Sequence, residues 1–125
     1  MNKNLKLVVN NNINLKDKEI FFERNELKVI LDLYAKMVSE GSWKDYSLVI
    51  SSKQVGFSVF NNASENAKFR ICKNFKPLNK NLKYLVTDSK GKVIKNSYNL
   101  VTLINNINWK NLVFIFFDQK VLIAL

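Results

Sequence analysis

The 125-residue chain contains no histidine, one cysteine, one proline and three glycines. Histidine is the most common metal ligand and the usual general base near neutral pH, so its absence argues against the common metal and acid-base sites. The single cysteine, Cys72, excludes an internal disulfide framework and is typical of a reducing compartment. Gly41, Gly56 and Gly91 are isolated, so a glycine-rich phosphate-binding loop is missing. We therefore expect a non-enzymatic protein without cofactor or metal.

Long apolar runs are also scarce. The N-terminal segment offers only the three-residue run 7–9 and no cleavage-like site, so we expect no signal peptide. In the C-terminal sequence LVFIFFDQKVLIAL, residues 118–120 divide the apolar stretch into runs of six and five. Both runs are far shorter than the roughly 20 residues that cross a bilayer. We expect a cytoplasmic protein with no membrane span.

The net charge of +10 is unevenly distributed. Residues 1–65 contain nine Lys/Arg and eight Asp/Glu, whereas residues 66–117 contain ten Lys/Arg and a single acid, Asp88. The segment AKFRICKNFKPLNKNLKYLV, residues 67–86, has six cations and no carboxylate. Such an excess is typical of a protein that binds nucleic acid or another anionic partner.

The same composition has a second interpretation. Of the 20 cations 18 are lysine, and the chain contains 19 asparagines, a combination that AT-rich codons produce without selection for binding. Lysine is also weaker than arginine where bidentate phosphate recognition matters. Composition alone does not separate a functional basic surface from ordinary solvated lysines.

The periodicity of apolar residues predicts a single α+β domain over residues 19–125, preceded by a flexible lead-in over residues 1–18. Within residues 23–41, helical spacing predicts an amphipathic helix that ends near Gly41. Its apolar face is Leu27, Ile30, Leu31, Tyr34 and Val38.

After this helix the apolar period changes from 3.6 to 2, which predicts an antiparallel meander of about five short strands. The expected strands are residues 46–51, 55–60, 67–75, 83–88 and 92–95. A closing helix over residues 97–107 follows, with Ser97 as its N-cap, and residues 109–125 form an apolar C-terminal extension. Both helices are expected to cover one face of the sheet.

Alternation within the strand 67–75 places Phe69 and Ile71 on one face and Lys68, Arg70 and Cys72 on the other. We therefore expect a basic sheet face that binds nucleic acid or another anion. Its candidate residues are Lys44, Lys68, Arg70, Lys73, Lys83 and Lys92. A reactive Cys72 is disfavoured, because no histidine serves as its base and no second cysteine resolves a disulfide.

The stretch EGSWKDYS, residues 40–47, joins the first helix to the first strand of the meander. Trp43, Asp45 and Tyr46 are candidate partner contacts, since aromatic side chains on connecting loops often anchor a partner. The alternative is that Trp43 caps the core beneath the helix. The apolar tail, residues 112–117 and 121–125, is a second candidate contact surface. Its use would make the chain a protein-protein adaptor or a homodimer.

Three segments carry a family resemblance: ELKVILDLYAKMVSEGSWKDYS, VGFSVFNNASENAKFRICK and YLVTDSKGKVIKNSYNLVTLI. Over about residues 20–108 the chain resembles an alphaproteobacterial family of small proteins catalogued only as a domain of unknown function. The resemblance implies a bacterial cytoplasmic protein and carries over no catalytic residues. The family pattern has two arginines where this chain has Asn61 and Asn62, and Lys44 and Arg70 remain as matching cations.

Overall fold

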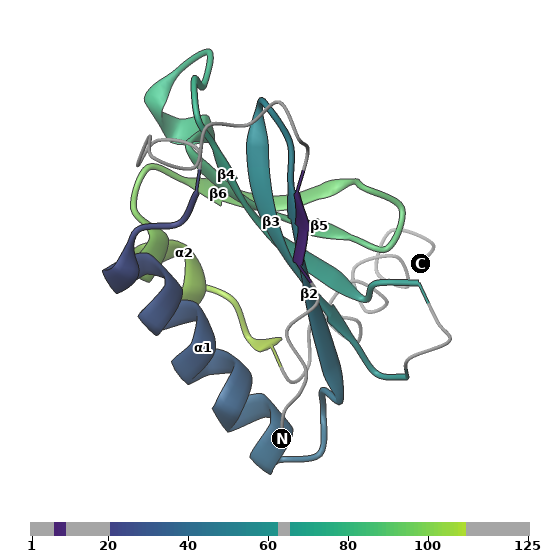
Figure 1. Cartoon of the computed structure of the whole chain (residues 1–125). Coiled ribbons are helices and arrows are strands. Elements are labelled where there is room, and N and C mark those ends of the chain that lie inside the picture. The colour runs from purple at the N-terminus through teal and green to yellow at the C-terminus, as the bar shows by residue number, and fades with distance from the viewer. Residues whose placement is uncertain (1–6, 10–20, 63–65, 110–125) are drawn as a thin grey trace, which may run out of the picture.

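The computed structural model describes residues 7–9, 21–62 and 66–109, and Figure 1 labels most of its helices and strands. In chain order the elements are β1 (Leu7–Val9), α1 (Arg24–Ser39), β2 (Asp45–Ile50), β3 (Gln54–Phe60), β4 (Phe69–Asn74), the 3-10 turn η2 (Lys80–Leu82), β5 (Tyr84–Asp88), β6 (Val93–Ser97) and α2 (Leu100–Asn105). The strands form one sheet in the order β1 to β6. The predicted α+β fold, with a helix, five antiparallel strands and a closing helix, is confirmed.

The first strand lies inside the predicted lead-in. Leu7–Val9 pairs in parallel with Leu48–Ile50 and extends the sheet beyond β2. An apolar and largely β-branched triplet is well suited to an otherwise open sheet edge, so the flexible lead-in is wrong for these three residues. The rest of that segment, like the apolar tail after Trp109, lies outside the described residues.

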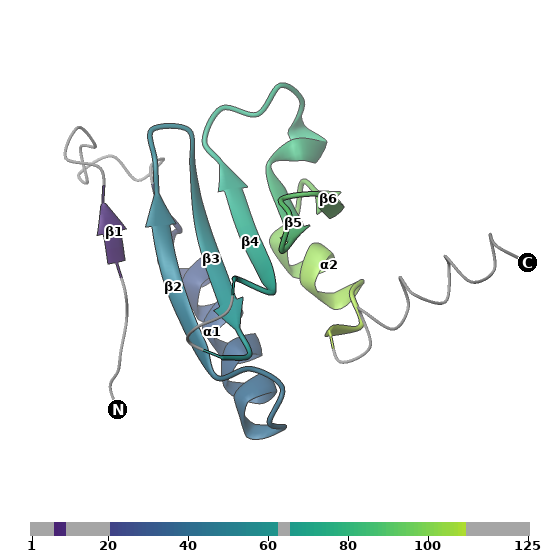
Figure 2. The same cartoon turned by 90° about the vertical axis from the view of Figure 1, so that its right-hand side faces the viewer.

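Both helices pack on the same face of the sheet (Figure 1). Ile30 and Met37 from α1 and Leu103 from α2 belong to one core cluster with the inward side chains of the strands. One row of that face runs across four strands, where Leu48, Phe57, Ile71 and Val86 are paired in register and fully buried. Figure 2 shows the opposite face, over which neither α1 nor α2 lies.

The side of α1 that is buried against the sheet is narrower than the apolar periodicity of the helix predicts. Leu31 and Val38 are 37% and 40% exposed, because α1 turns only the side with Ile30 and Met37 toward the sheet. Gly41 ends the helix region with a φ of +77°, a conformation that glycine adopts without steric cost.

The closing helix begins later than predicted. Ser97 ends β6, and the side-chain oxygen of Asn99 accepts the N–H of Thr102 at 2.9 Å as the N-cap of α2. In the described part of the chain, neither helix has the length and hydropathy needed to cross a bilayer.

Candidate functional site

The cations predicted from the sequence do not form one surface. Arg70 lies on the sheet face away from the helices, as alternation predicts, whereas Lys68 precedes β4 and its ammonium lies 5.7 Å from the centroid of the core ring of Phe69. Lys44, Lys68 and Lys92 lie toward the end of the sheet where β2 begins and β3 ends, whereas Lys83 precedes β5 at the opposite end. Two carboxylates, those of Asp45 and Asp88, lie among the first group.

Arg70 lies flat along the open sheet face rather than extending into solvent. Its Nε donates to the hydroxyl of Ser58 at 2.7 Å. Its aliphatic stem crosses Gly56, where a β-carbon on the glycine would stand 2.8 Å from Arg70 Cδ, so only glycine leaves room for it. Arg70 is therefore half-buried and contributes to the packing of this face.

Cys72 is a buried side chain of the same face. Burial raises the pKa of its thiol to about 11, and the nearby Arg70 guanidinium offsets only part of this effect. A thiol with a raised pKa is a poor nucleophile near neutral pH. The environment thus favours the structural interpretation of Cys72.

The prediction that Lys73 belongs to the basic sheet face is wrong. Lys73 is only 4% exposed and points toward the helices. Its ammonium donates to Glu26 Oε1 at 2.9 Å and to the carbonyl oxygen of Phe21 at 3.0 Å. The physical reason is the period of two: Lys73 falls on the same side of β4 as Phe69 and Ile71, which are core residues.

Glu26 is the centre of a buried polar cluster at the start of α1. Besides Lys73, its carboxylate accepts a hydrogen bond from the hydroxyl of Tyr84 and another from the N–H of Glu23. Burial alone raises the pKa of the Glu26 carboxyl. The hydrogen bonds from Lys73, Tyr84 and the Glu23 N–H outweigh burial and leave the pKa below its ordinary value of 4.5.

The free energy of unfolding should therefore decrease as the pH becomes acidic. A carboxyl whose pKa is lower in the folded than in the unfolded chain stabilises the fold above its unfolded pKa of about 4.5, and this stabilisation is lost as the pH falls through the lower folded value. We expect the urea midpoint to decrease below about pH 5. A variant in which Glu26, Lys73 and Tyr84 are replaced by Leu, Met and Phe should show a smaller decrease, and an identical decrease would contradict the assignment.

The prediction of Trp43 as a partner contact is also wrong. Trp43 is 1% exposed and packs edge-on against Trp109, with ring centroids 5.6 Å apart. Tyr46 is half-buried and stacks on Phe57 at 4.8 Å. Asp45 is half-buried, and its Oδ1 accepts the N–H of Tyr46 at 2.8 Å. The alternative interpretation, in which Trp43 completes the core beneath α1, describes its environment.

A different set of cations gathers where β2, β4 and β6 end. We call this surface the lysine end, and its residues are Lys53, Lys76, Lys80, Lys83 and Tyr98. The turn between β2 and β3 lies beside the connection between β4 and β5 (Figure 2), and the N–H of Phe75 donates to the carbonyl of Lys53 at 3.0 Å. In the same way the N–H of Asn74 donates to the carbonyl of Lys83 at 2.8 Å.

Tyr98 completes this surface. It directly follows Ser97, which pairs with Tyr84 in the sheet, so Tyr98 and Lys83 occupy the same end of neighbouring strands. The ammonium of Lys80 is 5.8 Å from the centroid of the Tyr98 ring. The tyrosine is 60% exposed, although most aromatic side chains of the described residues lie in the core.

The segments that form the lysine end, residues 51–53, 75–83 and 98–99, contain no carboxylate. Glu26 reaches this end from the helix side, but Lys73 and Tyr84 occupy its oxygens. Glu23 is exposed nearby and has an exposed cation, Arg24, as its neighbour. Among the described residues, the lysine end is therefore a concentrated positive surface, unlike the opposite end with its two aspartates.

Sequence reasoning identified Lys83 but missed Lys53, Lys76, Lys80 and Tyr98. The signal was partly visible, because residues 67–86 combine six cations with no acid. The strand alternation directed attention to residues 68–73, whereas the exposed lysines occupy the connection after β4. Lys53 and Tyr98 lie far from that connection in sequence and meet it only in the folded sheet.

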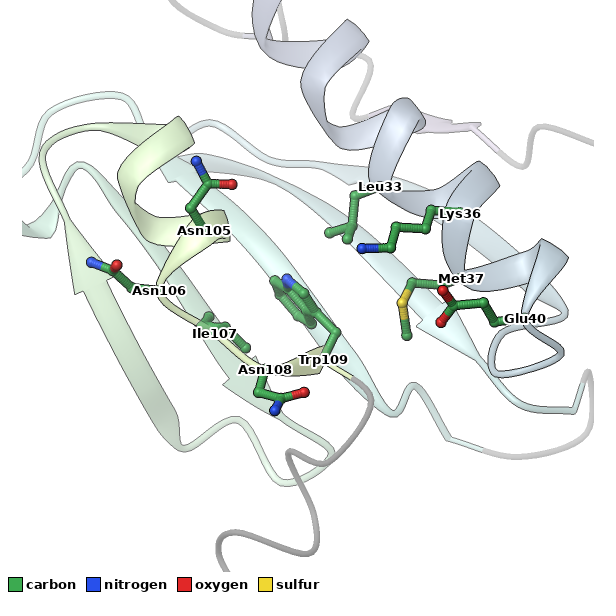
Figure 3. A pocket seen from close by; sticks show the side chains of 9 residues that line it. All are labelled: Leu33, Lys36, Met37, Glu40, Asn105, Asn106, Ile107, Asn108 and Trp109. Atoms are coloured by element: carbon green, nitrogen blue, oxygen red, sulfur yellow. The ribbon is translucent and has the colours of Figure 1, made fainter.

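A hollow of about 550 Å³ separates the end of α1 from the segment after α2 (Figure 3). The helix side contributes Leu33, Lys36, Met37 and Glu40, and residues 105–109 form the other wall. The ionisable side chains in this lining are Lys36 and Glu40, both exposed, and the indole of Trp109 lies between the walls. Across the described ranges, His, Cys, Asp and Glu side chains do not gather in a group that could hold a metal ion.

Comparison with known proteins confirms the family resemblance. A family model described as "Protein of unknown function (DUF2794)" matches residues 20–104. Neither a curated protein nor a solved structure matches the chain. The matched stretch includes the Glu26–Lys73–Tyr84 cluster and every residue of the lysine end.

Proposed function

We propose that this chain, which belongs to the family described as "Protein of unknown function (DUF2794)", is a non-enzymatic domain that binds nucleic acid at its lysine end. The observation that carries the proposal is the convergence of four lysines from two connections, β2–β3 and β4–β5, on one end of the sheet whose described connecting segments contain no carboxylate. The basic surface thus lies at the end of the sheet rather than on its face. The partner expected from the composition, a phosphate-rich polyanion, remains the same.

The chemistry of the lysine end supports phosphate contacts rather than base reading. Each lysine is a single point charge on a flexible stem, which neutralises a phosphate but does not form the bidentate pairs with base edges that arginine makes. Arg70 is held against Ser58 and Gly56 on the sheet face. We therefore expect binding with little sequence preference.

Binding should depend steeply on salt. If Lys53, Lys76, Lys80 and Lys83 each neutralise one phosphate, the logarithm of affinity should fall against the logarithm of salt concentration with a slope of about −2.8 to −3.6. Replacing all four by glutamine should weaken binding at least about tenfold and bring the slope close to zero. Fluorescence anisotropy with a labelled oligonucleotide, between about 50 and 200 mM salt, measures both quantities.

A charge-matched control is available at the other end of the sheet. Replacing Lys44, Lys68, Lys90 and Lys92 by glutamine removes the same net charge from the end where β2 begins and β3 and β5 end, which carries Asp45 and Asp88. This control should bind nearly as well as the original chain. Equal losses in both variants would indicate diffuse attraction by a lysine-rich protein, and absence of binding at low salt would end the proposal.

The alternative function is an adaptor or homodimer that uses the apolar tail. Its residues, 112–117 and 121–125, lie outside the described part of the chain, so the geometry supports nucleic-acid binding more directly. A chain truncated after Trp109 should keep its salt-dependent binding if the lysine end carries the function.

A further inference from the structure

We infer that the nucleic acid bound at the lysine end is single-stranded and stacks a base on Tyr98. This inference rests on the proposed function and names the form of its partner. The observation behind it is an aromatic ring that is 60% exposed and lies beside a cation, at the lysine end, whose described connecting segments contain no carboxylate. A nucleotide presents the complementary pair, a planar base and a phosphate a short distance away.

Side-chain hydrogen bonds hold the backbone around Tyr98. The N–H of the next residue, Asn99, donates to Ser97 Oγ at 3.1 Å, and Asn99 Oδ1 accepts the N–H of Thr102 at the start of α2. Tyr98 therefore connects the end of β6 to the first turn of α2, with side-chain hydrogen bonds across the junction. The backbone at such a junction loses little conformational freedom when a base stacks on the ring.

The backbone around Lys80 is also held by a side-chain hydrogen bond. It belongs to η2, whose N-cap Asn79 accepts the N–H of Asn81 through its side chain at 3.0 Å. The Lys80 ammonium lies 5.8 Å from the centre of the Tyr98 ring. Lys83 directly precedes β5, which pairs with β6, and its ammonium lies 5.3 Å from the centre of the Tyr84 ring. A base on the Tyr98 ring would thus have the Lys80 ammonium within reach of a flanking phosphate.

Stacking on Tyr98 requires a base whose face is free. In a duplex the base faces are covered by neighbouring pairs, whereas a single strand can splay a base onto an aromatic side chain. The absence of arginine from the lysine end agrees with this mode, because stacking is tolerant of sequence and does not read base edges. Single strands are therefore the favoured partner.

Leu78 offers the main competing interpretation. It is 97% exposed between Lys76 and Lys80, and an exposed apolar side chain flanked by lysines also suits an anionic membrane surface. However, one leucine is far shorter than a myristoyl chain, which alone gives only marginal membrane binding. Tyr98 and the spread of lysines over two connections favour a strand-like polyanion, and the membrane is left as an outcome of the test.

The test compares Tyr98→Ala with Tyr98→Phe in the full chain, using labelled oligodeoxythymidine and a duplex of equal length. Loss of one stacked base should weaken single-strand binding about 5- to 100-fold in Tyr98→Ala, with the salt slope unchanged. Tyr98→Phe keeps the ring and should bind nearly as well as the original chain. Val101→Ala, an exposed apolar position in α2, is the matched control and should have no effect.

The outcomes separate this inference from the proposed function. If Tyr98→Ala binds single strands normally while the four-lysine variant does not, stacking is wrong and phosphate binding stands. If the original chain binds duplex as tightly as single strands, the single-strand preference is wrong. If it binds neither nucleic acid but does bind vesicles containing phosphatidylserine, with loss in Leu78→Ala, both statements are overturned in favour of a membrane surface.

Discussion

Replacing Glu26 by leucine should destabilise the domain by about 3–5 kcal/mol, because the change leaves a buried cation without its counter-charge. The Lys73 ammonium would keep only the carbonyl of Phe21 as a partner, and its side chain is 5% exposed. The hydroxyl of Tyr84 would also lose its acceptor. Urea unfolding followed by circular dichroism measures the change in the free energy of unfolding.

Lys73→Met should cost less than Glu26→Leu. The Glu26 carboxylate would keep the Tyr84 hydroxyl and the Glu23 N–H, and it lies in the first turn of α1, where the helix dipole favours a negative charge. Replacing both residues by apolar ones, together with Tyr84→Phe, should recover most of the lost stability, since a well-packed apolar cluster can substitute for a buried ion pair.

The exposed pair Lys28–Asp32 is the control for these variants. Its atoms are also 2.9 Å apart, but the two side chains are 73% and 69% exposed. Replacing either by an uncharged residue should change stability by no more than about 0.5 kcal/mol. Comparable effects in the exposed and buried pairs would show that Glu26 and Lys73 are not a desolvated pair.

Trp43→Ala should destabilise the domain by about 3–5 kcal/mol, through lost burial and the cavity that remains. The indole is 1% exposed and contacts rings from two other segments, Tyr34 of α1 and Trp109 beyond α2. It therefore joins the helix, the sheet and the closing segment. Urea unfolding followed by circular dichroism avoids the loss of fluorescence that accompanies removal of a tryptophan.

Tyr98→Ala is the natural comparison, because it removes an exposed aromatic side chain instead of a buried one. It should change stability by less than about 0.5 kcal/mol. A small effect of Trp43→Ala together with weakened partner binding would restore the interpretation of Trp43 as an anchor. Comparison of Trp43→Ala with Tyr98→Ala thus separates the role of a core aromatic side chain from that of a surface one.

The lysine end also bears on why the chain is so basic. Lysine-rich composition by itself would place cations on every solvated surface and beside acids. The end opposite to the lysine end has this mixed character, with Asp45 and Asp88 among its lysines. The lysine end differs in having no acid in its three connections, and the two charge-matched glutamine variants test whether that difference has a function.

Several features could be predicted from local patterns. The apolar spacing of residues 27–38 is sufficient for an amphipathic helix, and the alternation of residues 46–88 is sufficient for strands. Alternation also predicts correctly that Arg70 lies on the face away from the helices. The same period places Lys73 with Phe69 and Ile71, so alternation is sufficient to predict that Lys73 faces the helices.

The amino-acid sequence by itself determined the α+β class, the order of the elements and the excess of positive charge, because periodicity and charge are properties of neighbouring residues. Tertiary structure alone decided which charged side chains are paired in the core and which lysines gather on one surface. Glu26 meets Lys73 and Tyr84 across more than 45 residues of chain, and Lys53 and Tyr98 reach the lysine end only through strand register. Such contacts depend on how strands and helices pack, and no local pattern encodes them.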